Sequence, residues 1–166
     1  GKGFEFLAEM ERMHMIVDVS HLSDKGFWDI VEHGTRPFAA SHSNCRALAP
    51  HTRNLTDEMI RALSECGGIA GLNYYAPFLD TDPTHPENCR STVELIAKHA
   101  AHYKQVGGAQ MIALGSDFDG IDGPHQLENA AFLPLLADAL RKEGFTEDEV
   151  EGIYYRNAMR FFEENL

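Results

Sequence analysis

Cysteine and basic side chains are both scarce in this sequence. The 166 residues include three cysteines, Cys45, Cys66 and Cys89, and no two of them form a CxxC pair. A disulfide framework and a cysteine zinc site are therefore not expected, whereas a reducing, cytoplasmic location is. Lysine and arginine number 14 against 26 aspartates and glutamates, for a formal charge of −12. Nucleic acids and anionic membranes bind clustered basic side chains, so neither is expected as a partner.

Long apolar runs and linker-like segments are also missing. The sequence contains no run long enough to predict a membrane segment, and it shows no secretory signal or lipidation motif. A hydrophobic content of 43% and a charged content of 24% are typical of a soluble globular protein. A chain of 166 residues is long enough for one hydrophobic core. We therefore expect a single domain over residues 1–166 that acts on a small molecule.

The sequence repeats one pattern, in which a short apolar run ends close to a polar side chain. Runs at residues 15–19, 37–41 and 111–115 are predicted to be buried strands, and they lead to His21, His42 and Asp117 respectively. In folds that alternate parallel strands with helices, the carboxyl ends of the strands meet at one edge, where ligands bind. The pattern therefore predicts that the two histidines and the aspartate lie together.

Helical segments separate these strands. Apolar spacing and capping residues predict helices at residues 4–12, 24–34, 57–66, 93–106, 130–142 and 146–165, with a further strand at 69–73. The expected caps are Ser23 and Thr56, and capping boxes are expected at residues 91–94 and at Thr146 with Glu149. Loops are expected at residues 43–54, 74–90 and 117–129. The fold class is thus α/β, with about four βα units. A complete (β/α)8 barrel of the TIM type has eight, so four units predict half of such a barrel.

Alternation along the strands predicts which side chains face the interior. His21 is expected to share a face with Val19, and His42 with Ala40, because side chains two residues apart point the same way. Asp18 then lies on the opposite face, as a buried carboxylate or a partner of a ligand. Three small residues, Ala40, Gly71 and Gly115, are expected to leave room beneath the site.

His21, His42 and Asp117 together favour a metal site over isolated structural residues. Neutral imidazole is a common zinc ligand, and a nearby carboxylate can orient a ligand or transfer protons. Arg53 lies on the loop above them and could bind a substrate carboxylate, although spacing alone favours a surface salt bridge. The other seven histidines are interpreted as surface residues: His14, His33, His51, His85, His99, His102 and His125.

Four strings carry a specific resemblance: IVDVSHLSDKGFWDI, RPFAASHSNCRALAPHTRNLTDE, GGIAGLNYYAPFL and IALGSDFDG. Together they closely resemble the membrane (renal) dipeptidase family, zinc metallopeptidases with amidohydrolase-like barrels. The resemblance implies a (β/α)8 barrel that holds two zinc ions, bridged by a carboxylate and by a hydroxide that attacks the peptide bond of a dipeptide. The function implied is that of a zinc-dependent dipeptidase.

The resemblance also assigns residues within these strings. His21 of VSH and His42 of SHSN are similar to the two histidines that hold one of the zinc ions. Asp117 of GSDFDG is similar to the catalytic acid, which binds the substrate and handles the proton for the leaving amine. Arg53 of TRNLTDE is similar to the arginine that clamps the carboxylate of the dipeptide, which reverses the interpretation from spacing. Residues 73–75, Asn-Tyr-Tyr, are expected to line the same mouth.

The sequence departs from the family in its metal ligands. The family also uses a His-x-Asp pair and a bridging glutamate from early strands, and no histidine here is followed two positions later by aspartate. The chain is therefore expected to be the C-terminal half of a dipeptidase, holding one zinc or fewer by itself. Half a barrel exposes sheet edges, so we expect a homo-oligomer or pairing with an N-terminal half. Two alternatives remain: a non-catalytic half-barrel subunit or fragment, and another amidohydrolase acting on an amide or lactam.

Overall fold

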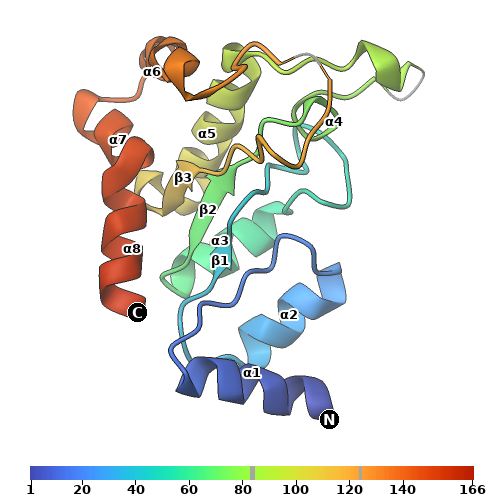
Figure 1. The fold of residues 1–166 in the computed structure, drawn as a ribbon, viewed down its shortest axis with the longest axis vertical. Coiled ribbons are helices and arrows are strands. Elements are labelled where there is room, and N and C mark those ends of the chain that lie inside the picture. Colours follow the sequence, from blue (N-terminus) through green and yellow to red (C-terminus); the bar gives the residue numbers. More distant parts are fainter. Residues whose placement is uncertain (83–84, 124) are drawn as a thin grey trace.

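A parallel three-stranded sheet forms the centre of the computed structural model, which describes residues 1–82, 85–123 and 125–166 (Figure 1). The strands are β1 (Ala39–Ala40), β2 (Ile69–Leu72) and β3 (Ile112–Leu114), in the order β1-β2-β3. These three predicted strands are confirmed, each shorter than expected. Parallel order brings their carboxyl ends to one edge of the sheet.

The strand expected at residues 15–19 is reduced to one bridged residue. Asp18 pairs with Ala39 as an isolated parallel bridge, and the neighbouring backbone groups of Val17 and Val19 bond to Ala39 at 2.9 and 2.8 Å. The segment therefore continues the sheet beyond β1, but its ladder ends there because the chain turns at Ser20.

Helices connect and cover the strands. They are α1 (Lys2–Arg12), α2 (Asp24–His33), α3 (Asp57–Glu65), α4 (Ala76–Leu79), α5 (Val93–Gly107), α6 (Leu133–Lys142), α7 (Glu147–Glu151) and α8 (Asn157–Asn165). Short 3-10 turns are η1 (Pro86–Asn88), η2 (Ala109–Met111) and η3 (Ala130–Phe132), and η4 (Gly152–Arg156) is a π-helical turn. The expected loops at 74–90 and 117–129 include residues 83, 84 and 124, which lie outside the described residues.

The caps predicted from the sequence place most helix starts correctly. Ser23 and Thr56 each accept a backbone N–H bond from the first turn of α2 and α3, as predicted. A full capping box forms at Thr146 and Glu149, as predicted. The box expected before α5 is wrong, because the Thr92 side chain is the cap recorded there.

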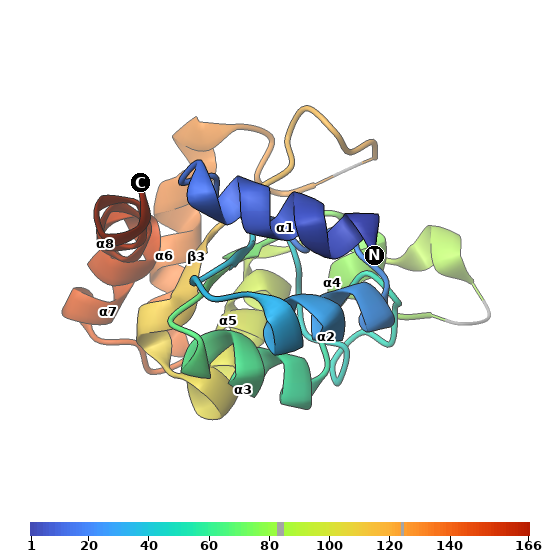
Figure 2. The same cartoon turned by 90° about the horizontal axis from the view of Figure 1, so that it is seen from below.

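The two faces of the sheet have different neighbours. Ala40, Ala70, Leu72 and Ile112 belong to the main core, which includes buried side chains of α3 and α5. Ala39, Ile69 and Ala113 form a second cluster on the other face, covered by Phe161 of α8. Figure 2 shows α2, α3 and α5 along one side of the molecule and α1 along the other.

This arrangement corrects the predicted faces of two strands. Ala39 pairs with Ile69, and directly paired residues in a parallel sheet share a face. Ala40 and Val19 therefore face the main core beneath α3 and α5. Asp18 pairs with Ala39 and lies on the opposite face, with the second cluster, which is the reverse of the expectation. His42 still reaches the strand ends, because the chain turns after Ala40 and no longer alternates.

The room expected beneath the site is filled by backbone. A Cβ atom at Gly71 would overlap the carbonyl oxygen of Ser41 and lie 2.9 Å from the Ser41 carbonyl carbon. A Cβ at Gly115 would overlap the same oxygen and lie 3.0 Å from the Cα of Gly71. Both positions are glycine because the backbone after β1 crosses directly above them.

His99 is buried, which corrects its interpretation as a surface residue. It is 1% exposed, its Nδ1 accepts the backbone N–H of Cys45 at 3.0 Å, and its Nε2 lies 3.0 Å from the carbonyl oxygen of Leu79. Nδ1 accepts, so Nε2 carries the proton and donates to Leu79. Burial lowers the pKa of His99 to about 4, and the neighbouring His102 adds to this while the bond to Leu79 opposes it. The neutral ring thus joins α5 to the loop after β1 and to the end of α4.

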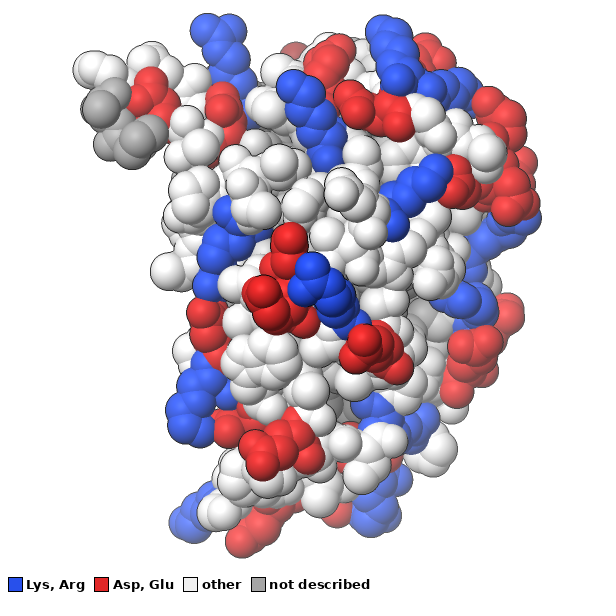
Figure 3. All heavy atoms as spheres, turned by 180° about the vertical axis from the view of Figure 1, so that it is seen from behind, with Lys and Arg blue, Asp and Glu red and all other residues white. Residues whose placement is uncertain are grey.

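Charged side chains of both signs are interspersed on the face shown in Figure 3. The exposed ion pairs of the molecule include Lys25–Asp29 at 2.8 Å and Arg141–Glu147 at 2.7 Å. Pairs of this kind contribute little to stability. Among the residues that the structure describes, no helix has the length and apolar character needed to cross a bilayer.

Candidate active site

His21 and His42 meet at the carboxyl ends of adjacent strand segments. Their Nε2 atoms lie 2.9 Å apart and their ring centroids 4.9 Å apart. His21 follows the bridged residue Asp18, and His42 follows β1, so parallel pairing of the two segments brings the rings together. The predicted convergence of these two residues is therefore seen.

Asp18 and Ser41 lie directly behind His42. The Oδ1 atom of Asp18 accepts the backbone N–H groups of Ser20 and Ser41 at 3.1 and 3.0 Å, and Oδ2 accepts the Ser41 hydroxyl at 2.5 Å. The same hydroxyl oxygen lies 2.7 Å from Nδ1 of His42. Burial raises the pKa of the Asp18 carboxyl, but these hydrogen bonds outweigh it and leave the pKa below its usual value. Asp18 is therefore an ionised acceptor.

Arg53 reaches the pair of histidines from the loop after His42. Its Nη2 lies 3.3 Å from Nε2 of His21, and its guanidinium carbon is 5.4 Å from the ring centre of Phe78. Its Nη1 is buried, with no hydrogen-bond partner among the residues that the structure describes. Burial lowers the pKa of Arg53, with Asp117 and Asp18 opposing the shift. The described residues include no ion pair to Arg53, so the surface salt bridge favoured by spacing does not form there.

Arg46 holds the loop that carries Arg53. Its guanidinium forms two hydrogen bonds to the Asp24 carboxylate, at 2.7 and 2.8 Å. It also donates to the backbone carbonyls of Thr52 at 3.0 Å and Asn54 at 2.8 Å, which flank Arg53 on both sides. Asp24 begins α2 shortly after His21. Arg46 therefore fixes the loop that carries Arg53 to the segment that carries His21.

Asp117 adopts a left-handed backbone conformation, with φ of 62°. Outside glycine this conformation is uncommon, and it turns the chain sharply after β3. The Asp117 carboxylate accepts a 3.1 Å bond from Nδ2 of Asn73, which is fully buried. Asn44 fixes Asn73 in turn through its Nδ2 and Oδ1 atoms, at 2.9 and 3.0 Å.

Burial favours the neutral form of the His42 ring. Burial lowers its pKa, Asp117 and Asp18 oppose the shift, and Arg53 and His21 reinforce it. A neutral imidazole is the form that binds a metal ion. Within the described ranges, no three side chains of His, Cys, Asp or Glu are grouped so as to hold a metal ion.

Sequence reasoning missed several supporting residues. Asn44, Arg46 and Ser41 act through hydrogen bonds between segments distant in the sequence, which no local pattern reveals. Asn73 was expected at the mouth and instead orients Asp117. Tyr74 does not line the mouth, because it is fully buried.

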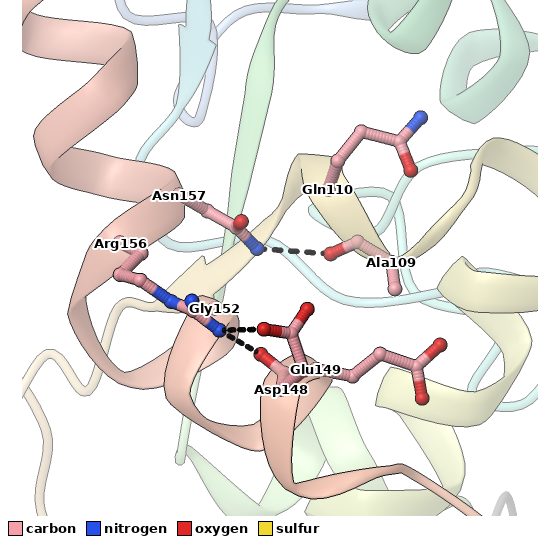
Figure 4. Close-up of a pocket in the computed structure, with 7 residues that line it drawn as sticks. All are labelled: Ala109, Gln110, Asp148, Glu149, Gly152, Arg156 and Asn157. Carbon is pink, nitrogen blue, oxygen red and sulfur yellow. Dashed lines mark hydrogen bonds and ion pairs between the residues drawn. The ribbon is translucent and has the colours of Figure 1, made fainter.

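A separate pocket of about 250 Å³ lies at the opposite end of β3, where the strand begins (Figure 4). Arg156 there donates to the backbone and carboxylate oxygens of Asp148, at 2.5 and 2.6 Å. Asn157 donates to the carbonyls of Ala109 and Ile112 at 2.9 and 2.8 Å. The Arg156 bonds join η4 to α7, and the Asn157 bonds join α8 to η2 and β3.

Known proteins resemble this chain in sequence and in fold. A protein of Klebsiella pneumoniae, uncharacterised and encoded in the pqqA 5' region, is 37% identical over 158 residues, which are 95% of this chain and 58% of that protein. Dipeptidase tcpJ of Claviceps purpurea is 33% identical over 98% of this chain and 37% of its own length. The chain thus spans only part of these relatives.

A solved structure matches almost the whole chain. The metallopeptidase of Rhodobacter sphaeroides, crystallised with a phosphinate mimic of the dipeptide L-Ala-D-Ala, superposes with a TM-score of 0.89 at 31% identity. The match covers 99% of this chain and 46% of that one. The sequence model of the membrane dipeptidases matches residues 2–165. The chain therefore belongs to the membrane dipeptidase family, peptidase family M19.

Proposed function

We propose that this chain is half of a (β/α)8 barrel and supplies part of the active site of a zinc-dependent dipeptidase. The parallel strands and their shared site edge support the barrel, as does the match to somewhat under half of a metallopeptidase structure. In this proposal His21 and His42 are ligands of one zinc ion, Asp117 is the catalytic acid, and Arg53 binds the substrate carboxylate. Further ligands come from elsewhere in the complete protein.

The observation that carries the proposal is the 2.9 Å approach of the two Nε2 atoms. The guanidinium of Arg53 can only donate, so its contact with His21 needs a lone pair on Nε2. The Ser41 hydroxyl donates its hydrogen bond to the ionised Asp18, so its oxygen can only accept from Nδ1 of His42. A neutral His42 with its proton on Nδ1 has an unprotonated Nε2. Two unprotonated nitrogens at this distance repel unless a cation lies between them. A zinc ion there would take both lone pairs, including the one on His21 that Arg53 contacts, and would leave Arg53 free to bind the substrate carboxylate.

The two nitrogens fit a zinc ion with a small movement. Ligand bonds of about 2.0–2.1 Å in a tetrahedral site separate two nitrogens by roughly 3.3 Å. A bound pair of metal ions would activate water and polarise the scissile carbonyl. Asp117, held by Asn73, would transfer the proton to the leaving amine. Arg53 would orient the dipeptide through its guanidinium, whose Nη1 has no hydrogen-bond partner within the described ranges.

His21→Ala and His42→Ala are each expected to lower the affinity for Zn²⁺ by about 100-fold or more, because two convergent ligands become one. Competition with a chromogenic chelator measures the affinity of the 166-residue chain. His33→Ala, at an exposed position on α2, is the matched control and should leave the affinity unchanged.

The same titration separates the alternatives. Unchanged affinity in both ligand variants would contradict the proposed site and favour a non-catalytic subunit. Two tightly bound metals with dipeptide turnover by the chain alone would mean that a second copy supplies the missing ligands. Turnover of amides or lactams in preference to dipeptides would favour the other amidohydrolase activity.

Arg53→Gln is expected to raise the KM of the complete enzyme for a dipeptide by roughly 10- to 100-fold, since hydrogen bonds to a charged group contribute about 1.5–3 kcal/mol. A dipeptide whose C-terminus is an amide lacks the carboxylate. It should be a poor substrate for the parent enzyme and no worse for Arg53→Gln. Equal losses on both substrates would contradict the clamp.

A further inference from the structure

We propose that Asp18 and Ser41 are positioning residues that fix the tautomer of His42, so that its Nε2 lone pair points at the site. The inference rests on the proposed role of His42 as a metal ligand. It concerns two side chains that touch neither the metal nor the substrate. They act on the far nitrogen of the ring.

Asp18 is held so that only one arrangement of protons is possible. Its Oδ1 is occupied by two backbone N–H groups, and its Oδ2 accepts from the Ser41 hydroxyl at 2.5 Å. An ionised carboxylate has no proton to give, so the hydroxyl must donate to it. Ser41 Oγ is then left with lone pairs only, and Nδ1 of His42 must donate across the 2.7 Å contact.

The backbone around His42 is held by the same group of residues. The N–H of His42 donates to Ser20 Oγ at 3.0 Å, and Ser20 N–H donates to Asp18. One carboxylate therefore sets both the position of the loop and the protonated nitrogen of the ring. Hydrogen bonds to the distal nitrogen of a ligating histidine commonly change metal affinity by about 10- to 100-fold.

Asp18→Asn gives the sharpest test because it keeps the shape and reverses the proton order. The two backbone N–H groups keep the amide oxygen at the Oδ1 position, so the NH2 group faces Ser41. Ser41 then accepts from the amide and donates to Nδ1 of His42. The proton of the neutral imidazole moves to Nε2, where it blocks ligation.

The experiment is long-range ¹H–¹⁵N NMR of histidine-labelled, metal-free chain at a pH where the imidazoles are neutral, followed by chelator competition with Zn²⁺. The parent chain is expected to carry the His42 proton on Nδ1, and Asp18→Asn on Nε2, with about 10- to 100-fold weaker zinc binding. Ser41→Ala should lose the fixed tautomer and Ser41→Thr should restore it, which keeps the test decisive if Asp18→Asn does not fold.

Asp57→Asn is the matched control, because Asp57 accepts from Nε2 of His102 at 2.7 Å outside the site. It should leave both the His42 tautomer and the zinc affinity unchanged. A His42 proton on Nε2 in the parent chain, or identical tautomers in the parent, Asp18→Asn and Ser41→Ala chains, would overturn the inference. His21→Ala should weaken zinc binding while the His42 tautomer persists. If the His42 tautomer changes in Asp18→Asn but the parent chain binds no zinc, the positioning role of Asp18 and Ser41 would stand and the proposed metal site would be refuted.

Discussion

Gly71→Ala is expected to destabilise the chain by about 3 kcal/mol or more and to weaken zinc binding with it. The added methyl group overlaps the Ser41 carbonyl oxygen and crowds the Cα of Gly115 at 3.0 Å. Both obstacles are backbone, so no rotamer change relieves them. Any shift that does relieve them moves Ser41, and Ser41 is bonded to His42.

Urea unfolding measures the first effect and chelator competition the second. Gly3→Ala is the control, because Gly3 lies within α1 and a Cβ there meets no atom of the described residues within 4 Å. It should be neutral or stabilising by up to about 1 kcal/mol. A Gly71→Ala chain as stable as its parent, with unchanged metal affinity, would contradict the close backbone approach.

The unfolding free energy is expected to fall by about 3 kcal/mol between pH 6.5 and pH 4 because of His99. The unfolded side chain takes up a proton near 6.5, whereas the folded pKa lies at about 4. In this window the unfolded state binds more protons, so stability rises with pH. The contribution of the neutral His99 ring to the free energy of unfolding is complete above pH 6.5 and is lost as the pH falls towards 4.

His99→Gln isolates this contribution from the carboxylates that also titrate in acid. The amide can accept from Cys45 and donate to Leu79 but does not ionise, so the variant should show a flatter pH profile between 4 and 6.5. Denaturant unfolding at several pH values gives the slope of the unfolding free energy against pH for the parent and for His99→Gln. His33→Gln, at an exposed position, should keep the parent slope. Parallel profiles for the parent and His99→Gln chains would contradict the buried neutral imidazole.

Local patterns predicted the elements well, and contacts between distant segments were the part they missed. The strands at 39–40, 69–72 and 112–114 and the caps Ser23, Thr56 and Thr146 follow from apolar runs and short-range hydrogen bonding. The faces of the first two segments were predicted wrongly, because strand alternation gives two faces but not which of them meets the helices. That choice follows from the pairing of Ala39 with Ile69.

The site shows the same division. Strand ends predicted that His21 and His42 meet, and the family strings drew attention to Arg53. The Asp18–Ser41 bond and the Asn44–Asn73 pair join residues 23 and 29 positions apart. Hydrogen bonds at such separation have no period or motif. The burial of His99 was missed because α5 is covered on several sides, so a polar residue within it does not mark a solvent face.

The left-handed turn at Asp117 limits which sequences can occupy this position. Glycine, asparagine and aspartate are the residues that adopt such a backbone most readily, and among them aspartate alone has a side chain that can exchange a proton. Single-nucleotide changes convert an aspartate codon to asparagine or glycine. One mutation at this position can therefore abolish the proposed proton transfer while the backbone keeps its shape. A relative with asparagine at this position would keep the turn and an oxygen that can accept the bond from Asn73, and would be a naturally occurring, catalytically silent form.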